Sequence, residues 1–296
     1  MLRARLPLLA ALLLVAAAAA AWVGGRGRPG GDGPVLRAAP VAQAKDNPCL
    51  DPALGPQLRC PDLIMRRPFG MRTERTRRGR VLLRAGNAID SVGDGPAELR
   101  GARAGTRGRW MDAEQVIHRH DGGVLRVRTG ARLEFKLAHL HRRWWKMHDA
   151  ARFELWRLAD DGTPRERVRV GPKVAYCLRD LERNHGTLPL SPRRAVYPAC
   201  STSARRTHVT LGTSVGWSDV YPPDYPEQWI DVTGLRGCFA YVHTADPTDA
   251  IRERDETNNQ AQVVVRLPFR ARDPRGGCAG RQFGVRYRGA GGVGVW

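Results

Sequence analysis

Short hydrophobic stretches separated by turn residues run through the middle of the chain. They are rich in β-branched and aromatic residues, and Asp-Gly, Gly-Gly and Pro-Pro pairs stand between them, as is typical of antiparallel strands. No long stretch follows the 3.6-residue period of an amphipathic helix. The pattern predicts an all-β fold, an antiparallel β-sandwich with long loops. The expected strands are residues 80–90, 122–130, 131–141, 151–158, 173–180, 207–212, 237–245 and 260–268.

Two further stretches, 91–100 and 254–268, have the pattern of a turn followed by a strand. In the second we expect Asp255, Asn258 and Asn259 to hydrogen-bond the backbone of their own turn, as such side chains commonly do. A calcium site is the alternative interpretation of the same residues.

The N-terminal part of the chain differs from this central region. Arg3 and Arg5 precede an apolar run, residues 6–23, which predicts a signal peptide or a retained N-terminal anchor over residues 1–23. Either one predicts a secreted or cell-surface protein. Residues 24–47 are rich in Gly, Pro and Ala without periodicity, and they predict a disordered linker.

The β-sandwich domain is expected to span residues 48–270. Residues 271–296 are rich in Gly and Arg and predict a loose C-terminal tail, unless Cys278 ties it down.

The six cysteines are disulfide candidates in an exported protein, although six cysteines allow fifteen pairings. No Cys-x-x-Cys pair occurs, which argues against a zinc knuckle. Two pairs bracket loops and two cysteines remain: Cys49 with Cys60, Cys177 with Cys200, and the unassigned Cys238 and Cys278.

The basic residues are almost all arginine. The net charge is +20, and of 49 Lys and Arg residues four are lysine. The arginines are spread along the chain, with clusters at 72–80 and after residue 269, so we expect no nucleic-acid function. For an exported basic protein, an anionic cell-surface polymer is the expected polyelectrolyte partner. Against this background Lys173 is unusual, because it lies in an apolar, strand-like run beside a cysteine.

Four motifs occur in a fixed order around this lysine: GPKVAYCLRD from residue 171, VYPAC from 196, GTSVGWSDVYPPDYPEQWIDVTGL from 212 and RERDETNNQAQVVV from 252. Over roughly residues 62–267 the chain resembles the lysyl oxidase family, in its bacterial branch. The resemblance implies a β-sandwich copper amine oxidase. It also implies a cofactor, lysine tyrosylquinone, made from a tyrosine and a lysine of the protein itself.

Carried over to this sequence, the resemblance assigns the cofactor lysine to Lys173 and the cofactor tyrosine to Tyr221. Asp219, two residues before the tyrosine, is the preferred general base. The resemblance also implies a Cys177–Cys200 disulfide. The expected reaction converts primary amines, including peptidyl lysine, to aldehydes, with O2 as the oxidant and hydrogen peroxide and ammonia as products.

The copper ligands are less well defined. The family binds copper through His-x-His-x-His on one strand, where alternate residues share a face. His139 and His141 fit the first two positions, but Arg143 occupies the third, and an arginine cannot bind copper. An insertion that bulges the strand would bring His148 into the set, and we take His139, His141 and His148 as the candidate ligands.

Two alternatives remain for the copper site. Aligning the stretch on DAARFEL (149–155) places the three positions at Arg142, Trp144 and Lys146, which removes the site. His118 and His120 form a second pair on one strand face that would contribute a ligand.

The competing hypothesis is a catalytically inactive β-sandwich of the same family. Such a protein would keep the scaffold without the metal and bind anionic cell-surface polymer through its arginines.

Overall fold

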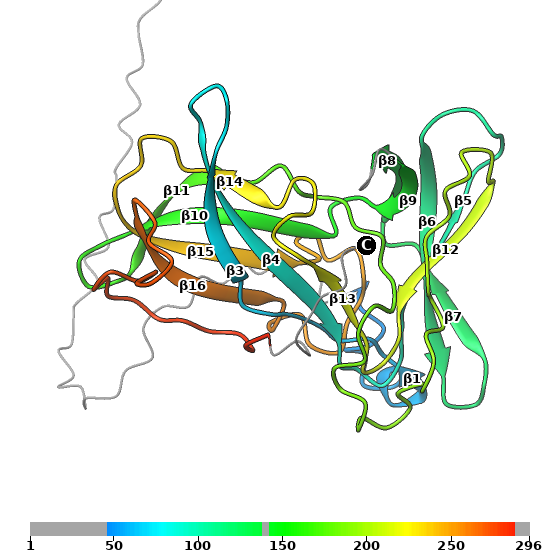
Figure 1. The fold of residues 1–296 in the computed structure, drawn as a ribbon. Coiled ribbons are helices and arrows are strands. Elements are labelled where there is room, and N and C mark those ends of the chain that lie inside the picture. Colours follow the sequence, from blue (N-terminus) through cyan, green and yellow to red (C-terminus); the bar gives the residue numbers. More distant parts are fainter. Residues whose placement is uncertain (1–45, 138–141, 288–296) are drawn as a thin grey trace, which may run out of the picture. The chain divides into compact units, whose positions relative to one another are not determined.

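The computed structural model describes residues 46–137 and 142–287, which belong to one compact unit (Figure 1). These residues form strands, loops and short turns such as the 3-10 turn η2 (Gly55–Gln57), and no α-helix occurs among them. Consequently no helix in this part of the chain is long and apolar enough to cross a membrane. The expected leader, residues 1–23, and most of the expected linker lie outside the described residues.

The described strands form three antiparallel sheets. The largest has the order β12-β5-β6-β8-β9, with β1 and β7 also paired to β6. Its strands are β1 (Leu58–Arg59), β5 (Ala97–Ala102), β6 (Trp110–Arg119), β7 (Val124–Val127), β8 (Arg132–Leu137), β9 (Arg143–Met147) and β12 (His208–Thr213).

The other two sheets pack against each other. The four-stranded sheet has the order β11-β10-β15-β16, and the five-stranded sheet is built around the long strand β4, which pairs with β2, β3, β13 and β14. The four-stranded sheet contains β10 (Ala151–Leu158), β11 (Pro164–Val170), β15 (Gly237–Ala245) and β16 (Gln260–Leu267). The five-stranded sheet contains β2 (Leu63–Met65), β3 (Phe69–Arg75), β4 (Val81–Ser91), β13 (Ser218–Tyr221) and β14 (Trp229–Asp231).

The main hydrophobic core lies between these sheets. Strands β2 and β14 contact the four-stranded sheet, and buried side chains such as Leu83, Phe153 and Tyr241 share one cluster with Leu133 of the seven-stranded sheet. These side chains are fully excluded from water, so their burial is the main source of stability for the fold. The all-β prediction is confirmed.

The segment after β16 covers the outer face of the four-stranded sheet. Cys278 forms a disulfide with Cys238 of β15 and packs in a small second core with Val242 and Val264. Phe283 exchanges backbone hydrogen bonds with Gln262 of β16. Cys278 thus ties this part of the C-terminal segment to the sheet.

Seven of the eight expected strands are confirmed within the described residues, as β4, β7, β8, β10, β12, β15 and β16. The strand expected at 173–180 is wrong. Its backbone groups bond to several separate segments, with a single bridge between Tyr176 and Met147 of β9 and a bond from Asp180 N to Tyr197 O, so no continuous ladder forms. Strands β3 and β11 went unpredicted because each has several charged residues and mostly exposed side chains.

The acid-and-amide turn before β16 braces the N-terminal part of the unit. Asp255 accepts a hydrogen bond from Thr257 N at 2.8 Å, which confirms its expected turn role. Asn258 and Asn259 were expected to do the same, and this is wrong, because they donate to Asp62 and Glu253 at 2.8 Å each. No group of three His, Cys, Asp or Glu residues in the described ranges is arranged to hold a metal ion.

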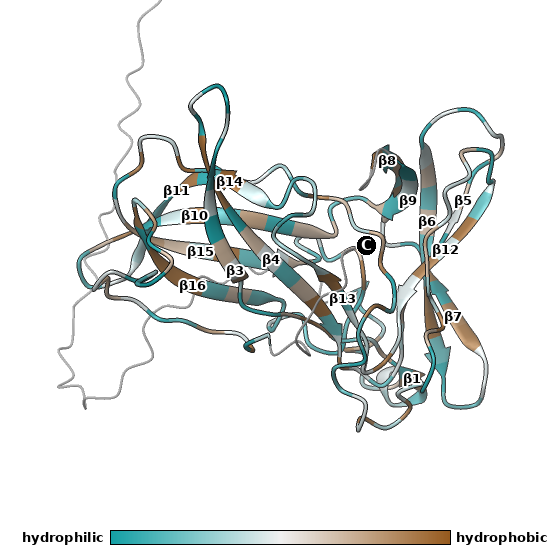
Figure 2. Ribbon diagram, in the orientation of Figure 1, coloured by the Kyte–Doolittle hydropathy of each residue, from teal (hydrophilic) through white to brown (hydrophobic). Residues whose placement is uncertain are grey.

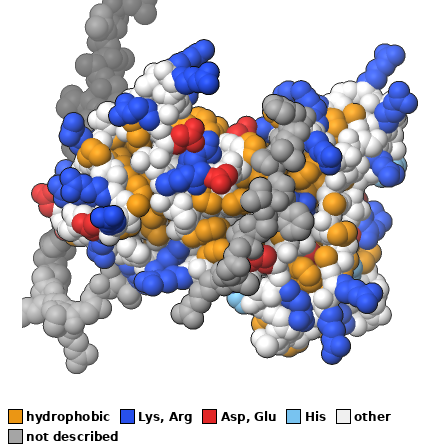
Figure 3. All heavy atoms as spheres, in the orientation of Figure 1, with side chains coloured by type: hydrophobic (Ala, Val, Ile, Leu, Met, Phe, Trp, Pro, Cys, Tyr) orange, Lys and Arg blue, Asp and Glu red, His pale blue; other side chains and the backbone are white. Residues whose placement is uncertain are grey.

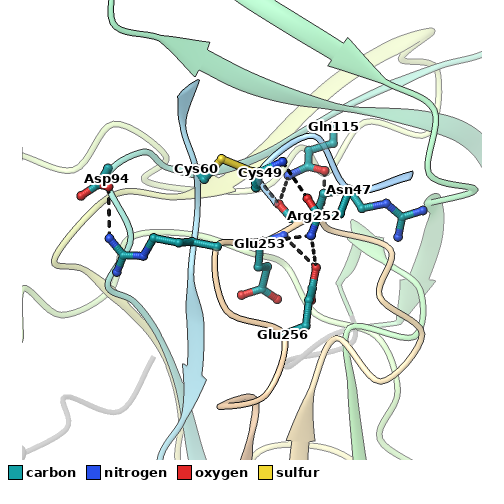
Figure 4. The surroundings of a disulfide bond; sticks show 9 residues. Asn47, Cys49, Cys60, Asp94, Gln115, Arg252, Glu253 and Glu256 are labelled. Carbon is teal, nitrogen blue, oxygen red and sulfur yellow. Dashed lines mark hydrogen bonds and ion pairs between the residues drawn. A yellow bond between two sulfur atoms is a disulfide. The ribbon is translucent and has the colours of Figure 1, made fainter. Parts of the chain in front are cut away.

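The Cys49–Cys60 disulfide lies beside this turn (Figure 4). Asn47 donates to Glu256 at 2.7 Å and to the backbone oxygen of Glu253 at 3.0 Å. The disulfide and these bonds hold the start of the described chain against the loop before β16.

The arginines are dispersed over the surface. Figure 3 shows Lys and Arg side chains scattered over the visible face, including the tip of the β3–β4 hairpin. This hairpin tip is hydrophilic in Figure 2 and carries the exposed residues Arg75, Arg77 and Arg78.

Candidate functional site

Lys173 lies on the irregular segment that runs beside the end of β9 and the start of β10. Ala150 N donates to Val174 O at 2.8 Å, and Tyr176 exchanges both of its backbone hydrogen bonds with Met147. These bonds hold the segment on both sides of the connection between the two strands. Lys173 lies within it and is only 1% exposed, so its amine faces the protein interior.

Tyr221 is the last residue of β13. Pairing with β4 places it opposite Asn87, and Pro222 follows at the point where the strand ends. The ring is buried, and its hydroxyl donates to the backbone oxygen of Cys177 at 3.2 Å. Because Cys177 is bonded to Cys200, the disulfide predicted from the resemblance is confirmed and it anchors this acceptor.

Three tyrosine rings surround the Lys173 amine. Its Nζ lies 4.4 Å from the ring centre of Tyr225, 4.5 Å from that of Tyr221 and 4.7 Å from that of Tyr176. The Tyr221 ring meets the other two edge to face, at 4.7 and 4.8 Å between centres. Lys173 Nζ has no hydrogen-bond partner in the described part of the chain. The structure therefore brings Lys173 and Tyr221 together, although they are 48 positions apart in sequence.

Burial sets the ionisation of both groups. It lowers the pKa of Lys173 well below its ordinary value, and the nearby charge of Lys146 lowers it further. This favours the uncharged amine, which is the nucleophilic form. Burial also raises the pKa of Tyr221 well above its ordinary value, and the Asp219 carboxylate adds to this effect. The phenol accordingly stays protonated.

Asp219 precedes Tyr221 by two residues on β13 and is completely buried. Neither carboxylate oxygen has a hydrogen-bond partner of normal geometry among the described residues. Burial raises the pKa of Asp219 to about 8, although the positive charges of Arg179 and Lys173 oppose this shift. A carboxyl group with this pKa exchanges protons near neutral pH, as a general base requires.

Three of the four lysines of the chain gather at this site. Besides Lys173, Lys146 is buried and donates to Leu137 O at 3.0 Å, and burial lowers the pKa of Lys146 to about 8. Lys136 forms an ion pair with Glu227 at 3.0 Å. The rarest basic residue is thus concentrated where the tyrosines meet.

His148 is the one candidate copper ligand within the described residues. It follows β9 directly, and its Nδ1 lies 3.3 Å from Glu134 Oε2 while its Nε2 lies 3.7 Å from Asp149 Oδ1. Its ring meets that of Trp110 edge to face.

His139 and His141 lie outside the described residues. The alternative ligand His118 contacts Glu98 at 3.0 Å. Within 46–137 and 142–287 no three His, Cys, Asp or Glu side chains gather to hold a metal ion, so the described residues alone do not fit a copper centre.

Sequence reasoning missed four side chains around the site. Tyr176, Tyr225 and Glu227 had no signal beyond their position inside the quoted motifs. His243 on β15 is fully buried and stacks on Phe153 at 3.9 Å, and burial lowers the pKa of His243 to about 3, so it stays neutral.

Comparison with known proteins agrees with this geometry. The family model described as lysyl oxidase matches residues 127–270, which include Lys173, Asp219 and Tyr221. Human protein-lysine 6-oxidase is 32% identical over 120 residues, which is 40% of this chain and 25% of that protein. The pig protein-lysine 6-oxidase is 31% identical over 120 residues, 40% of this chain and 43% of its own length.

The frog Xenopus tropicalis has a similar protein, lysyl oxidase homolog 2, that is 26% identical over 157 residues, 51% of this chain and 18% of that protein. The match therefore spans less than half the length of each of these relatives. The matched region contains both the segment of the buried lysine and the strand β13 of the tyrosine, whereas β4, which pairs with β13, precedes it. These matches support the assignment of residues 127–270 of this chain to the lysyl oxidase family.

Proposed function

We propose that this chain is an exported amine oxidase whose catalytic domain spans residues 48–270 and whose cofactor is built from Lys173 and Tyr221. The observation that carries the proposal is the Lys173 amine, which lies buried 4.5 Å from the centre of the Tyr221 ring. A buried amine without a hydrogen bond costs stability, and such costs are typical of functional sites. Three disulfides support export, because they are typical of proteins outside the reducing cytosol.

The buried side chains fit a lysine tyrosylquinone. Because Lys173 Nζ has no hydrogen-bond partner among the described residues, bonding to the ring would break no such contact. When formed, the quinone would supply a carbonyl that condenses with a primary amine and accepts two electrons from it. Tyr176 and Tyr225 pack against the site and exclude water from it.

Asp219 is the proposed general base. Its carboxyl group is buried beside Tyr221, with a pKa of about 8, so it exchanges protons near neutral pH. Its role would be to accept the proton from the α-carbon of the bound amine. The neighbouring positive charge of Arg179 favours its ionised form.

The proposed overall reaction converts R–CH2–NH2, O2 and H2O to R–CHO, NH3 and H2O2. The amine carbon is oxidised by two electrons and O2 is reduced by two. Substrates in this proposal are peptidyl lysine or small primary amines. The name of the human and pig relatives, protein-lysine 6-oxidase, supports a lysine side chain as one of them.

The proposal includes copper, with His139, His141 and His148 as its ligands. The position of His148 beside Met147, which pairs with Tyr176, supports its inclusion. Bound copper per chain, measured after growth in copper-supplemented medium, tests this part. Replacement of each histidine by alanine should lower that ratio, and an unchanged ratio in all three variants would remove these residues from the proposal.

The cofactor itself is tested by mass spectrometry of copper-loaded, air-exposed protein. A proteolytic digest should contain one cross-linked species carrying the segments around Lys173 and Tyr221. Staining with nitroblue tetrazolium should be positive for the wild type and negative for Lys173→Arg and Tyr221→Phe. Tyr287→Phe, a tyrosine outside the cluster, is the matched control and should stain. Separate, unmodified lysine and tyrosine peptides in the wild type would contradict the proposal.

A second candidate function is binding of anionic cell-surface polymer without catalysis. The exposed arginines at the tip of the β3–β4 hairpin favour it, because they project where a polyanion can reach them. Retention on a heparin column distinguishes the two functions when combined with an assay of peroxide release from benzylamine. Retention without staining, copper or peroxide supports the binding function alone.

A further inference from the structure

Glu227 and Lys136 form an ion pair beside the tyrosine cluster. Lys136 Nζ lies 3.0 Å from Glu227 Oε2, and both side chains are partly exposed, at 22% and 33%. Lys136 belongs to β8, and Glu227 lies in the loop that joins β13 to β14, two residues after Tyr225. The ion pair is thus accessible to solvent, although it lies next to buried groups such as Tyr225.

The backbone at Glu227 is unusual. Its φ is +67°, a left-handed conformation that glycine adopts freely and a glutamate rarely does. The surrounding turn holds it there, with bonds from Trp229 N to Glu227 O at 2.9 Å and from Gln228 N to Tyr225 O at 3.2 Å. Strain of this kind is concentrated at active sites and ligand-binding loops, which makes Glu227 a candidate for function.

The charge of Glu227 reaches the buried amines. After burial, which lowers the pKa of Lys146, Glu227 has the largest opposing effect, and Glu227 also opposes the lowering at Lys173. Asp219, the other carboxyl group that acts on both lysines, is fully buried. Glu227 therefore combines two properties: its charge affects the pKa of both buried lysines, and its side chain is partly exposed, so a cation from solvent can reach it.

The chemistry of the proposed reaction defines what this carboxylate can bind. An amine must be uncharged to condense with a carbonyl, so the reacting nitrogen is not the cation that a carboxylate holds. A second amino group on the substrate, which stays protonated near neutral pH, would be the cation that Glu227 binds. Lys136 shows that a primary ammonium on a flexible four-carbon stem fits against Glu227.

We propose that Glu227 is the specificity-determining residue that binds a second cationic group of the amine substrate, and that Lys136 occupies this place in the free protein. The inference rests on the proposed function and narrows its substrates to dicationic amines. Diamines, and lysine side chains that lie beside a further positive charge, belong to this class. A partly exposed pair such as Lys136–Glu227 is weak, so a substrate ammonium displaces Lys136 at little cost.

Binding of cadaverine, a five-carbon diamine, to the full-length protein prepared without copper tests the inference. Isothermal titration at low ionic strength measures affinity without any turnover. Glu227→Gln should weaken cadaverine binding about tenfold, because it removes a charge-assisted hydrogen bond. Lys136→Met should strengthen binding several-fold, because it removes the competing ammonium. Pentan-1-ol, which has the same chain length and no charge, should bind wild type and Glu227→Gln equally.

Glu166→Gln is the matched control, since Glu166 also pairs with a surface cation, Arg157, at 3.1 Å, but lies on β11. Equal cadaverine affinity in wild type and Glu227→Gln would overturn the inference. If Glu227→Gln does not fold, a failure of Lys136→Met to strengthen binding does so. These titrations need no quinone, so they test the role of Glu227 separately from the proposed oxidase activity. Glu227-dependent binding can be found in a protein that forms no quinone, and an active oxidase can bind cadaverine without Glu227.

Discussion

Two buried carboxyl groups, Asp90 and Asp219, lie one residue out of register on the paired strands β4 and β13, and they differ in their hydrogen bonds. Asp90 of β4 pairs opposite Ser218, and the next residue of β13 is Asp219. Asp90 accepts hydrogen bonds from Arg66 at 2.5 Å and from Ser218 at 2.6 Å, and His185 lies 2.8 Å away. Asp219 is equally buried, without a hydrogen-bond partner of normal geometry among the described residues.

This contrast separates structural from functional burial. Around Asp90 the chain supplies hydrogen-bond partners for a buried carboxylate. The paired strands β4 and β13 can therefore accommodate such partners. Among the described residues, Asp219 and Lys173 have no such hydrogen bonds of normal geometry, and burial raises the pKa of Asp219 and lowers the pKa of Lys173, which favours the uncharged form of each. The first arrangement stabilises the sheet, whereas the second keeps reactive groups neutral.

The strongest way to break the comparison is Asp90→Ala. The substitution leaves the buried Arg66 charge without its carboxylate, and removing one partner of a buried pair costs about 3–5 kcal/mol. Urea unfolding followed by tryptophan fluorescence should show that loss. Asp94→Ala, which removes a carboxylate more than half exposed, should change the unfolding free energy by less than about 1 kcal/mol. Equal effects would refute the structural role of Asp90.

Lys173→Met should have the opposite sign. It replaces a buried amine, which has no hydrogen-bond partner among the described residues, by an apolar side chain of similar shape, and burying such a polar group costs about 1–3 kcal/mol. The same variant should lose quinone staining completely. Urea unfolding of copper-free preparations, in which no cross-link joins Lys173 to Tyr221, checks the first expectation. Nitroblue tetrazolium staining of copper-loaded preparations checks the second. A destabilised Lys173→Met protein would mean that the amine contributes to stability, contrary to the comparison.

A third way to sharpen the comparison concerns pH. In the unfolded chain an aspartate ionises near pH 4, whereas Asp219 in the native protein has a pKa of about 8. Between these values the native state holds a proton that the unfolded state has lost, so the stability contributed by Asp219 falls as pH rises, by up to about 1.4 kcal/mol per pH unit.

Asp219→Asn should remove that contribution, so the difference in unfolding free energy between wild type and variant should change across pH 5–8. Urea unfolding at several pH values measures this difference. Asp160→Asn, at an exposed position, should give a pH-independent difference. A flat difference for Asp219→Asn would show that Asp219 ionises normally.

The sequence predicted best the strands that carry long apolar stretches, and it missed β6, whose buried residues alternate with polar ones. β4, β10, β15 and β16 have long apolar stretches and were found nearly to the residue. Charged edge strands such as β11 gave no such signal, because solvent on both sides removes the need for apolar residues. Segment 173–180 looked like a strand because it is apolar, but its backbone bonds to several separate segments and forms no ladder.

The site was partly predictable. Lys173, Tyr221 and Asp219 came from a resemblance between motifs, and no periodicity indicated that residues 48 positions apart would meet. Glu227 could not have been found this way, because its importance depends on a left-handed backbone and on Lys136 from a distant strand. The copper ligands stay a prediction, since two of the three lie outside the described residues.

The replacement of lysine by arginine has a consequence for the proposed activity. An oxidase that accepts lysine side chains is a hazard to its own copies, since every accessible primary amine is a target for conversion to a reactive aldehyde. Here 45 of the 49 basic side chains carry a guanidinium, which cannot be deaminated in this way. Within the described residues, two lysine side chains are buried and the third is ion-paired. The protein thus keeps a strongly positive charge with few primary amines that the proposed reaction could oxidise.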